Sequence, residues 1–244
     1  MNTFGDGFSG VRKLEVGNVR PMSLHYMLKK MPSVDWLSLL NTAPCQRGAR
    51  HEEVLRSMCK VVRSVKPALR HLAINNDAEE DFHDALMPLV ELTELRTLVL
   101  RLGSETILTP ALLSCWPKLK YFHANATISD GGLHTLVYMH PELESLSFYG
   151  LDDCSLRGLT GIGEFMSSGV PSSLTALSLV NCMGIHPEAL IALAGVHPLR
   201  KLAIAFFDFK ETEVNFKMAD LLKFAAGCPL LEELELGEFH VGYV

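Results

Sequence analysis

The sequence predicts an α/β solenoid in which short parallel strands line one face and helices line the other. Three observations predict this fold. A phrase of three apolar residues, placed at its first, fourth and sixth positions, recurs nine times along the 244 residues. A segment with helical periodicity follows most phrases, and a proline precedes most of them. Successive phrases begin 23 to 35 residues apart, which suits one strand–turn–helix unit.

Each phrase predicts one short strand, because alternate residues of a strand point to opposite faces of a sheet. The central apolar residue should face the core, so Leu98, Leu146, Leu177 and Leu202 are expected to be fully buried. The nine phrases are Val11-Leu14-Val16, Val34-Leu37-Leu39, Leu69-Leu72-Ile74, Leu95-Leu98-Leu100, Leu119-Phe122-Ala124, Leu143-Leu146-Phe148, Leu174-Leu177-Leu179, Leu199-Leu202-Ile204 and Leu231-Leu234-Leu236.

Helices are predicted between the strands. In Arg50–Val65 the apolar residues recur with a spacing of three and four, which marks one buried helix face. Ser129 and Asn215 are suitable N-caps, and a proline such as Pro67 or Pro141 ends a helix just ahead of a strand. The helical segments are Pro21–Met31, Arg50–Val65, Glu79–Leu92, Ser129–Met139, Pro187–Val196 and Asn215–Ala226.

One such unit cannot bury its apolar side alone, whereas stacked copies share a continuous core. We therefore expect right-handed crossovers, about nine parallel strands on a concave face, and helices on the convex face. Residues 1–10, which contain three glycines, are expected to be a flexible tail, and residues 11–244 one repeat domain. Ala43–Gly48, Ser155–Gly169 and Phe206–Val214 lengthen three units, as partner-contacting insertions or as loops of variable length.

Composition narrows the function classes. The net charge of −6 and the pI near 5.9 disfavour binding to nucleic acid backbones or anionic membranes. The amino terminus lacks the pattern of a secretory signal, and no apolar run reaches the length of a membrane span. Six scattered cysteines without a CxxC spacing predict reduced thiols. We expect a cytoplasmic location, with nuclear or mitochondrial locations as alternatives.

No catalytic, metal or cofactor site is predicted. The sequence contains no HExxH, P-loop or GxSxG motif. Gly158, Gly161 and Gly163 lack the strand-to-helix context of a phosphate loop. His134 and His140 flank one helix without further ligands at metal-binding spacing. The expectation is a chain that is not an enzyme and uses no cofactor.

The concave sheet is the candidate binding surface. Strand residues that alternate with buried ones should face outward there, and interface hot spots favour Trp, Tyr and Arg. The alternative interpretation is that aromatic side chains simply pack well on a sheet. The predicted partner-binding residues are Trp36, His71, Arg101, Tyr121, His123 and Tyr149.

The repeated phrase resembles the strand signature of leucine-rich repeat proteins. Two segments, PSSLTALSLVNCMGIHPEALIALAGVHPLR and TISDGGLHTLVYMHPELE, resemble the cysteine-containing repeats of F-box proteins. Cys182 matches the cysteine that follows the strand, and Cys228-Pro229 and His140-Pro141 match the repeat opening. Ile128, Asp130, Gly132 and Leu133 match the helix start. The resemblance implies substrate selection for ubiquitination, but no F-box is recognised, so the binding role is the part expected here.

We therefore expect a non-catalytic protein-interaction scaffold, either an accessory subunit of a larger assembly or a substrate receptor. The alternative is a regulator that inhibits an enzyme, as the similar ribonuclease-inhibitor type repeats do. The partner is expected to be a protein, with no nucleic acid and no membrane span. Leu234 and Leu236 lie in the ninth and last phrase, so no later repeat is predicted to cover them. The carboxyl-terminal edge is therefore expected to be covered by another protein or by further sequence.

Overall fold

The computed structural model describes residues 8–40, 50–76, 78–103, 105–150, 157–160, 172–182, 187–205 and 218–237. Each predicted phrase contains a five-residue strand. The nine strands are β1 (Lys13–Gly17), β2 (Trp36–Leu40), β3 (His71–Asn75), β4 (Thr97–Arg101), β5 (Tyr121–Asn125), β6 (Ser145–Tyr149), β7 (Ala176–Val180), β8 (Lys201–Ala205) and β9 (Glu233–Gly237). The strands are parallel and follow the chain order. The predicted fold class, a leucine-rich repeat solenoid, is confirmed.

Helices alternate with the strands. They are α1 (Pro21–Lys30), α2 (His51–Val65), α3 (His83–Leu86) with the 3₁₀ helix η1 (Met87–Glu91), α4 (Pro110–Leu113), α5 (Asp130–Tyr138), α6 (Arg157–Thr160), α7 (Pro187–Leu193) and α8 (Met218–Gly227). They form two compact units with the strands. The first unit lies within Met1–Ile107 and Cys115–Leu119 and contains β1 to β4, and the second lies within Leu108–Ser114 and Lys120–Val244 and contains β5 to β9.

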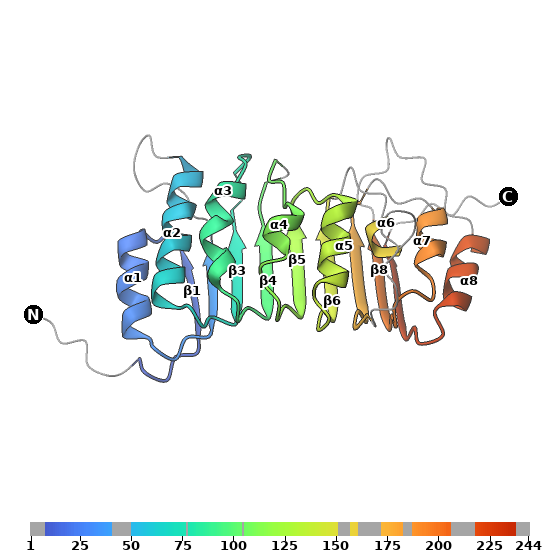
Figure 1. The fold of residues 1–244 in the computed structure, drawn as a ribbon, viewed down its shortest axis with the longest axis horizontal. Coiled ribbons are helices and arrows are strands. Elements are labelled where there is room, and N and C mark those ends of the chain that lie inside the picture. Colours follow the sequence, from blue (N-terminus) through green and yellow to red (C-terminus); the bar gives the residue numbers. More distant parts are fainter. Residues whose placement is uncertain are drawn as a thin grey trace, which may run out of the picture. The chain divides into compact units, whose positions relative to one another are not determined.

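In the first unit, α1, α2 and α3 lie over one face of the strands (Figure 1). The pairing register aligns equivalent positions of successive repeats, so that Leu72 lies beside Leu98 and Ile74 beside Leu100. All four side chains are buried. The opposite sheet face carries the alternating strand residues, and we call it the open face of the unit.

The second unit has the same arrangement, with Leu146, Leu177 and Leu202 aligned across β6, β7 and β8. These three leucines are buried, as is Leu98 in the first unit, which confirms the predicted register. The strand residues that alternate with the buried ones form the open face of this unit.

Strands β1 and β9 differ from the others because their apolar residues are less buried. Leu14 and Val16 of β1 are half-buried. Leu234 and Leu236 of β9 keep 40% and 39% of their accessible surface. Whether a protein covers the β9 edge stays a prediction, and the residues after Gly237 lie outside the described ranges.

Two predicted helices differ in extent. The helix expected over Glu79–Leu92 is instead a short α3 followed by the 3₁₀ turn η1, because Pro88 has no N–H for an α-helical bond. Helix α7 ends at Leu193, and Gly195 then adopts a positive φ of 77°. The start predicted at Asn215 lies outside the described residues.

Ser129 is confirmed as an N-cap, since its hydroxyl accepts a hydrogen bond from the Gly132 N–H.

Of the three predicted insertions, only part of Ser155–Gly169 lies within the described residues. It contains α6, in which Gly158 meets α5 at very close range. A Cβ atom on Gly158 would lie 1.9 Å from the carbonyl oxygen of Asp130 and 2.8 Å from the backbone nitrogen of His134. This glycine therefore allows two helix backbones to touch, rather than forming part of a phosphate loop.

In three repeats, the residue before the proline buries a polar or aromatic side chain against the preceding repeat. Lys66 Nζ donates to the carbonyls of Met31 and Pro32 at 2.6 and 2.8 Å, and Trp116 Nε1 donates to Leu89 O at 3.0 Å. In the second unit, His197 Nε2 lies 2.7 Å from Leu159 O. Each of these contacts bonds a carbonyl of the previous repeat, and it adds to the backbone N–H that Met31 O and Leu89 O already accept.

Candidate protein-binding surface

The open face of the first unit carries a row of packed side chains at the beginning of its strands. Trp36 and His71 stack, with their ring centroids 4.8 Å apart and an interplanar angle of 19°. Lys13 Nζ lies 5.4 Å from the Trp36 ring centroid. On the far side, His71 Nδ1 lies 2.9 Å from the Thr97 hydroxyl. The four residues occupy the same position of four adjacent strands, so the parallel register brings them together.

In this row, Lys13 to Thr97, the Trp36 indole and the His71 imidazole each have neighbours on both sides. Lys13 and His71 come from the strands on either side of Trp36, so both faces of the indole are occupied. The indole N–H of Trp36 has no hydrogen-bond partner in the described part of the chain. Burial lowers the pKa of His71, and Arg70 and Arg96 lower it further, while Asp35 opposes them. The row therefore leaves the indole N–H of Trp36 as a donor that a partner can use.

A second row of charged residues lies just before the strands, and we call it the rim row. Where neighbouring strands of one unit both carry a charge at this position, the charges usually pair. Arg12 pairs with Asp35, Lys120 lies 2.9 Å from Glu144, and Arg200 pairs with Glu232. The rim row also contains Arg70 and Arg96 on the neighbouring strands β3 and β4. Sequence reasoning missed these two arginines because it considered only the alternating strand positions.

The open face of the second unit carries tyrosines and a histidine in hydrogen bonds between strands. Tyr121 donates its hydroxyl to Glu144 at 2.9 Å, and this bond raises the pKa of Tyr121. His123 Nδ1 lies 2.9 Å from Ser147 Oγ. Asn181 Nδ2 donates to Tyr149 Oη at 3.1 Å, and about two fifths of Tyr149 is exposed. These bonds leave the aromatic rings of both tyrosines available to a partner.

A shallow hollow of about 240 Å³ lies beside these residues on the same open face. Small side chains line it, among them Ala176, Ser178 and Ala203. The Lys201–Glu233 ion pair, at 2.6 Å, borders it. The hollow is large enough to take one bulky side chain of a partner.

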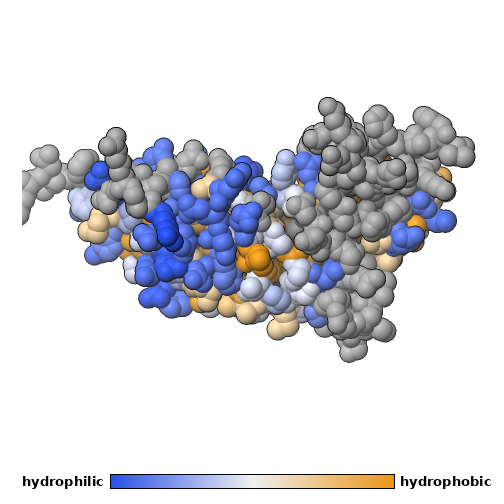
Figure 2. Space-filling view, turned by 90° about the horizontal axis from the view of Figure 1, so that it is seen from above, coloured by the Kyte–Doolittle hydropathy of each residue, from blue (hydrophilic) through white to orange (hydrophobic). Residues whose placement is uncertain are grey.

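The six predicted binding residues are all on open-face positions. The structure brings Trp36 and His71 into contact, whereas Arg101 lies at the other end of β4 and is exposed. In the second unit, Tyr121 is the first residue of β5, His123 is the middle residue of the same strand, and Tyr149 is the last residue of β6. Figure 2 shows that hydrophilic residues predominate over the described surface of the first unit in that view. That these residues bind a partner stays a prediction.

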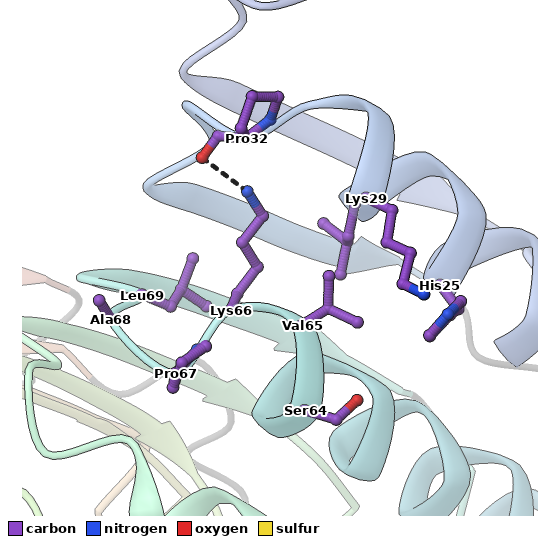
Figure 3. Close-up of a pocket in the computed structure, with 10 residues that line it drawn as sticks. His25, Lys29, Pro32, Ser64, Val65, Lys66, Pro67, Ala68 and Leu69 are labelled. Atoms are coloured by element: carbon purple, nitrogen blue, oxygen red, sulfur yellow. Dashed lines mark hydrogen bonds between the residues drawn. The ribbon is translucent and has the colours of Figure 1, made fainter.

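A larger cavity of about 610 Å³ lies where α1 and α2 end (Figure 3). Its polar lining consists of His25, Lys29, Ser64 and Lys66. The ammonium of Lys66 is committed to the carbonyls of Met31 and Pro32. The role of Lys66 is therefore to cap α1 rather than to bind a ligand in this cavity.

Other chemistry is sparse in the described ranges. They contain no group of three His, Cys, Asp or Glu side chains that would hold a metal ion. Cys59, Cys115, Cys182 and Cys228 form no disulfide among the described residues, and burial raises the pKa of Cys59 far above its usual range. Within the same ranges, no helix has the length and apolar character needed to cross a bilayer.

The similarity of this chain to known proteins is with solved structures. No family model matches the chain, and no curated protein matches it. The chain is similar to the crystal structure of a TLR13–ssRNA13 complex, with 13% identity and a TM-score of 0.45. The match covers 97% of this chain and 37% of the TLR13 chain. The present chain therefore spans little more than a third of the length of the TLR13 chain.

Proposed function

We propose that the chain is a non-catalytic scaffold whose open sheet face binds a protein partner. The observation that carries the proposal is the row from Lys13 to Thr97, in which the Trp36 indole and the His71 imidazole stack between neighbours on both sides. Rigid aromatic side chains bind at low entropic cost, since little of their freedom remains to be lost. Repeat solenoids generally use such extended faces for binding.

The predicted partner-binding residues are Trp36, His71 and Arg101 in the first unit and Tyr121, His123 and Tyr149 in the second. The finer proposal is an accessory subunit of a larger assembly, or a substrate receptor like the F-box proteins whose repeats the sequence resembles. An inhibitor of the ribonuclease-inhibitor type is the alternative. A cytoplasmic location is proposed with either role.

Site-specific photocrosslinking in the native cell tests the proposal. A photoreactive phenylalanine analogue replaces Ala73 or Ser147 on the open faces, or Lys60 or Lys223 on helices as matched exposed controls. We expect discrete protein adducts from the open-face positions only. Adduct formation from Ala73 should fall when Trp36 is replaced by alanine. Adducts from the helix positions alone would contradict the proposal.

The identity of the adduct separates the two roles. A cullin-ligase adaptor in the complex would support a substrate receptor, and a stable stoichiometric partner would support an accessory subunit. An enzyme whose activity falls upon binding would instead support the inhibitor.

A further inference from the structure

The rim row pairs opposite charges in both units, with one exception. Arg12·Asp35, Lys120·Glu144 and Arg200·Glu232 are ion pairs across neighbouring strands. Arg70 and Arg96 are the exception, because they place two like charges side by side. Their backbones are directly bonded, since the Arg96 N–H donates to Arg70 O at 2.7 Å. Like charges facing each other across strands are unfavourable unless an anion lies between them.

No acidic side chain of the described residues forms an ion pair or a hydrogen bond with either guanidinium group. Both arginines are exposed, and neither forms a side-chain hydrogen bond or ion pair there. Asp35, on the neighbouring strand, is paired with Arg12. Glu94 is paired with Lys118 at 2.6 Å. Arg70 and Arg96 also help to lower the pKa of Glu94, after its hydrogen bond to Lys118. One carboxylate is thus shared by a lysine and two arginines, which leaves the arginine pair with excess positive charge.

We propose that Arg70 and Arg96 form a carboxylate-binding site that holds an acidic segment of the protein partner. This inference rests on the proposed function and names the chemistry of the partner. Guanidinium groups bind carboxylates through two parallel hydrogen bonds. Adjacent strands lie about 4.8 Å apart, so one carboxylate can bridge the two groups or two can bind side by side. The free indole N–H of Trp36 lies on the row beside them and suits a partner carbonyl.

An acidic peptide fits this site better than a single-stranded nucleic acid. Nucleic acid binding of that kind stacks bases on the faces of aromatic rings. Both faces of Trp36 are already covered, by Lys13 and by His71. A base would have to displace one of them, whereas a carboxylate needs only the guanidinium groups and the indole N–H. The net charge of −6 also disfavours a polyanion of high charge density.

Fluorescence anisotropy with a labelled probe tests the site. The probe is a ten-residue peptide of alternating Glu and Leu, and a Lys/Leu peptide of equal length is the negative probe. The variants are Arg70→Gln/Arg96→Gln and the matched control Lys60→Gln/Arg63→Gln, which removes two exposed charges from helix α2. We expect the wild type and the control to bind the acidic probe equally. The Arg70→Gln/Arg96→Gln variant should lose about tenfold or more in affinity.

A second variant separates binding from folding. Arg96→Glu recreates the opposite-charge pattern of the rim row with Arg70. It should raise the melting temperature by about 1–2 °C and abolish binding of the acidic probe. A purely structural role for the arginines would not move these two readouts in opposite directions.

Two results would overturn the inference. One is equal binding of the acidic probe by the wild type and Arg70→Gln/Arg96→Gln. The other is tighter binding of a ten-nucleotide oligouridylate, lost in the same variant, which would identify a nucleic acid surface. If crosslinks from Ala73 persist in Arg70→Gln/Arg96→Gln, the acidic site fails and the proposed scaffold function stands. If open-face crosslinks are absent from the wild type, the scaffold function itself fails.

Discussion

At the scale of single residues, side chains just before the prolines join one repeat to the next. Trp116 is completely buried and donates its N–H to Leu89 O. His197 plays the same part with Leu159 O, and Lys66 with Met31 O. The three side chains differ in type, yet each supplies a donor to a carbonyl at the end of a helix. At these three repeat openings, a residue other than cysteine supplies the hydrogen-bond donor.

Replacing Trp116 with phenylalanine tests this role. The change keeps the aromatic bulk but removes one of the two donors to Leu89 O, the other being the Leu92 N–H at 2.9 Å, so we expect a loss of about 0.5–1.5 kcal/mol in the free energy of unfolding. Trp36→Phe is the matched control, because the indole N–H of Trp36 makes no hydrogen bond within the described residues. Urea denaturation followed by circular dichroism measures both. Equal losses for the two variants would contradict the role of the donor.

Gly158 offers a second test at this scale. A Cβ atom at this position would meet the Asp130 carbonyl oxygen at 1.9 Å, and a backbone atom cannot move aside as a side chain can. Gly158→Ala should therefore lower the free energy of unfolding by about 2 kcal/mol or more. Gly131→Ala is the control, since its nearest neighbours lie at 3.7 Å, and it should be neutral or up to about 1 kcal/mol stabilising. A neutral Gly158→Ala would mean that α6 does not pack on α5 in this way.

At the scale of elements, the strands could be predicted from the sequence and several helices could not. The phrase of three apolar residues fixes which strand residues are buried, so the register of Leu72 beside Leu98 follows from it. The helices depend on finer features, such as Pro88 in the segment Glu79–Leu92. Likewise, Arg70 and Arg96 precede their strands, and period-two alternation says nothing about that position. Their pairing depends on which residue the neighbouring repeat supplies, and this needs the register as well as the sequence.

Leucine truncation measures the strand assignment directly. Leu146→Ala and Leu177→Ala each remove a fully buried side chain of the second unit, so each should cost about 2–5 kcal/mol of unfolding free energy. Leu234→Ala in β9 is the matched control in the same unit, because 40% of Leu234 is exposed, and it should cost about 1 kcal/mol or less. Comparable costs for Leu146 and Leu234 would show that β9 is buried in solution.

At the scale of the whole molecule, acid has two opposing effects on stability. Lowering the pH towards 5.9 neutralises the net charge of −6 and relieves electrostatic repulsion within the chain. Two buried histidines act in the other direction. Burial lowers the pKa of His140 and of His197 below the ordinary value of 6.5. Both belong to the second unit, and His140 Nε2 is buried without a partner among the described residues. Acid should therefore weaken the second unit more than the first, in which burial likewise lowers the pKa of His71.

The pH dependence of unfolding follows from these two groups. Between their lowered folded-state pKa values and 6.5, the unfolded chain binds more protons than the folded chain, so stability decreases as the pH falls. We expect the free energy of unfolding to be constant with respect to these histidines above about pH 7.5 and to decline from pH 7 to pH 5.5.

Hydrogen exchange at several pH values should show β6 and β7 losing protection before β2 and β3, because each repeat contacts only its neighbours. His197→Gln should flatten the decline, whereas His83→Gln, which removes a half-buried histidine of the first unit, should leave it unchanged. A decline of equal slope in His197→Gln and the wild type would assign the acid sensitivity to other groups. Equal loss of protection in both units would show that the repeats unfold together.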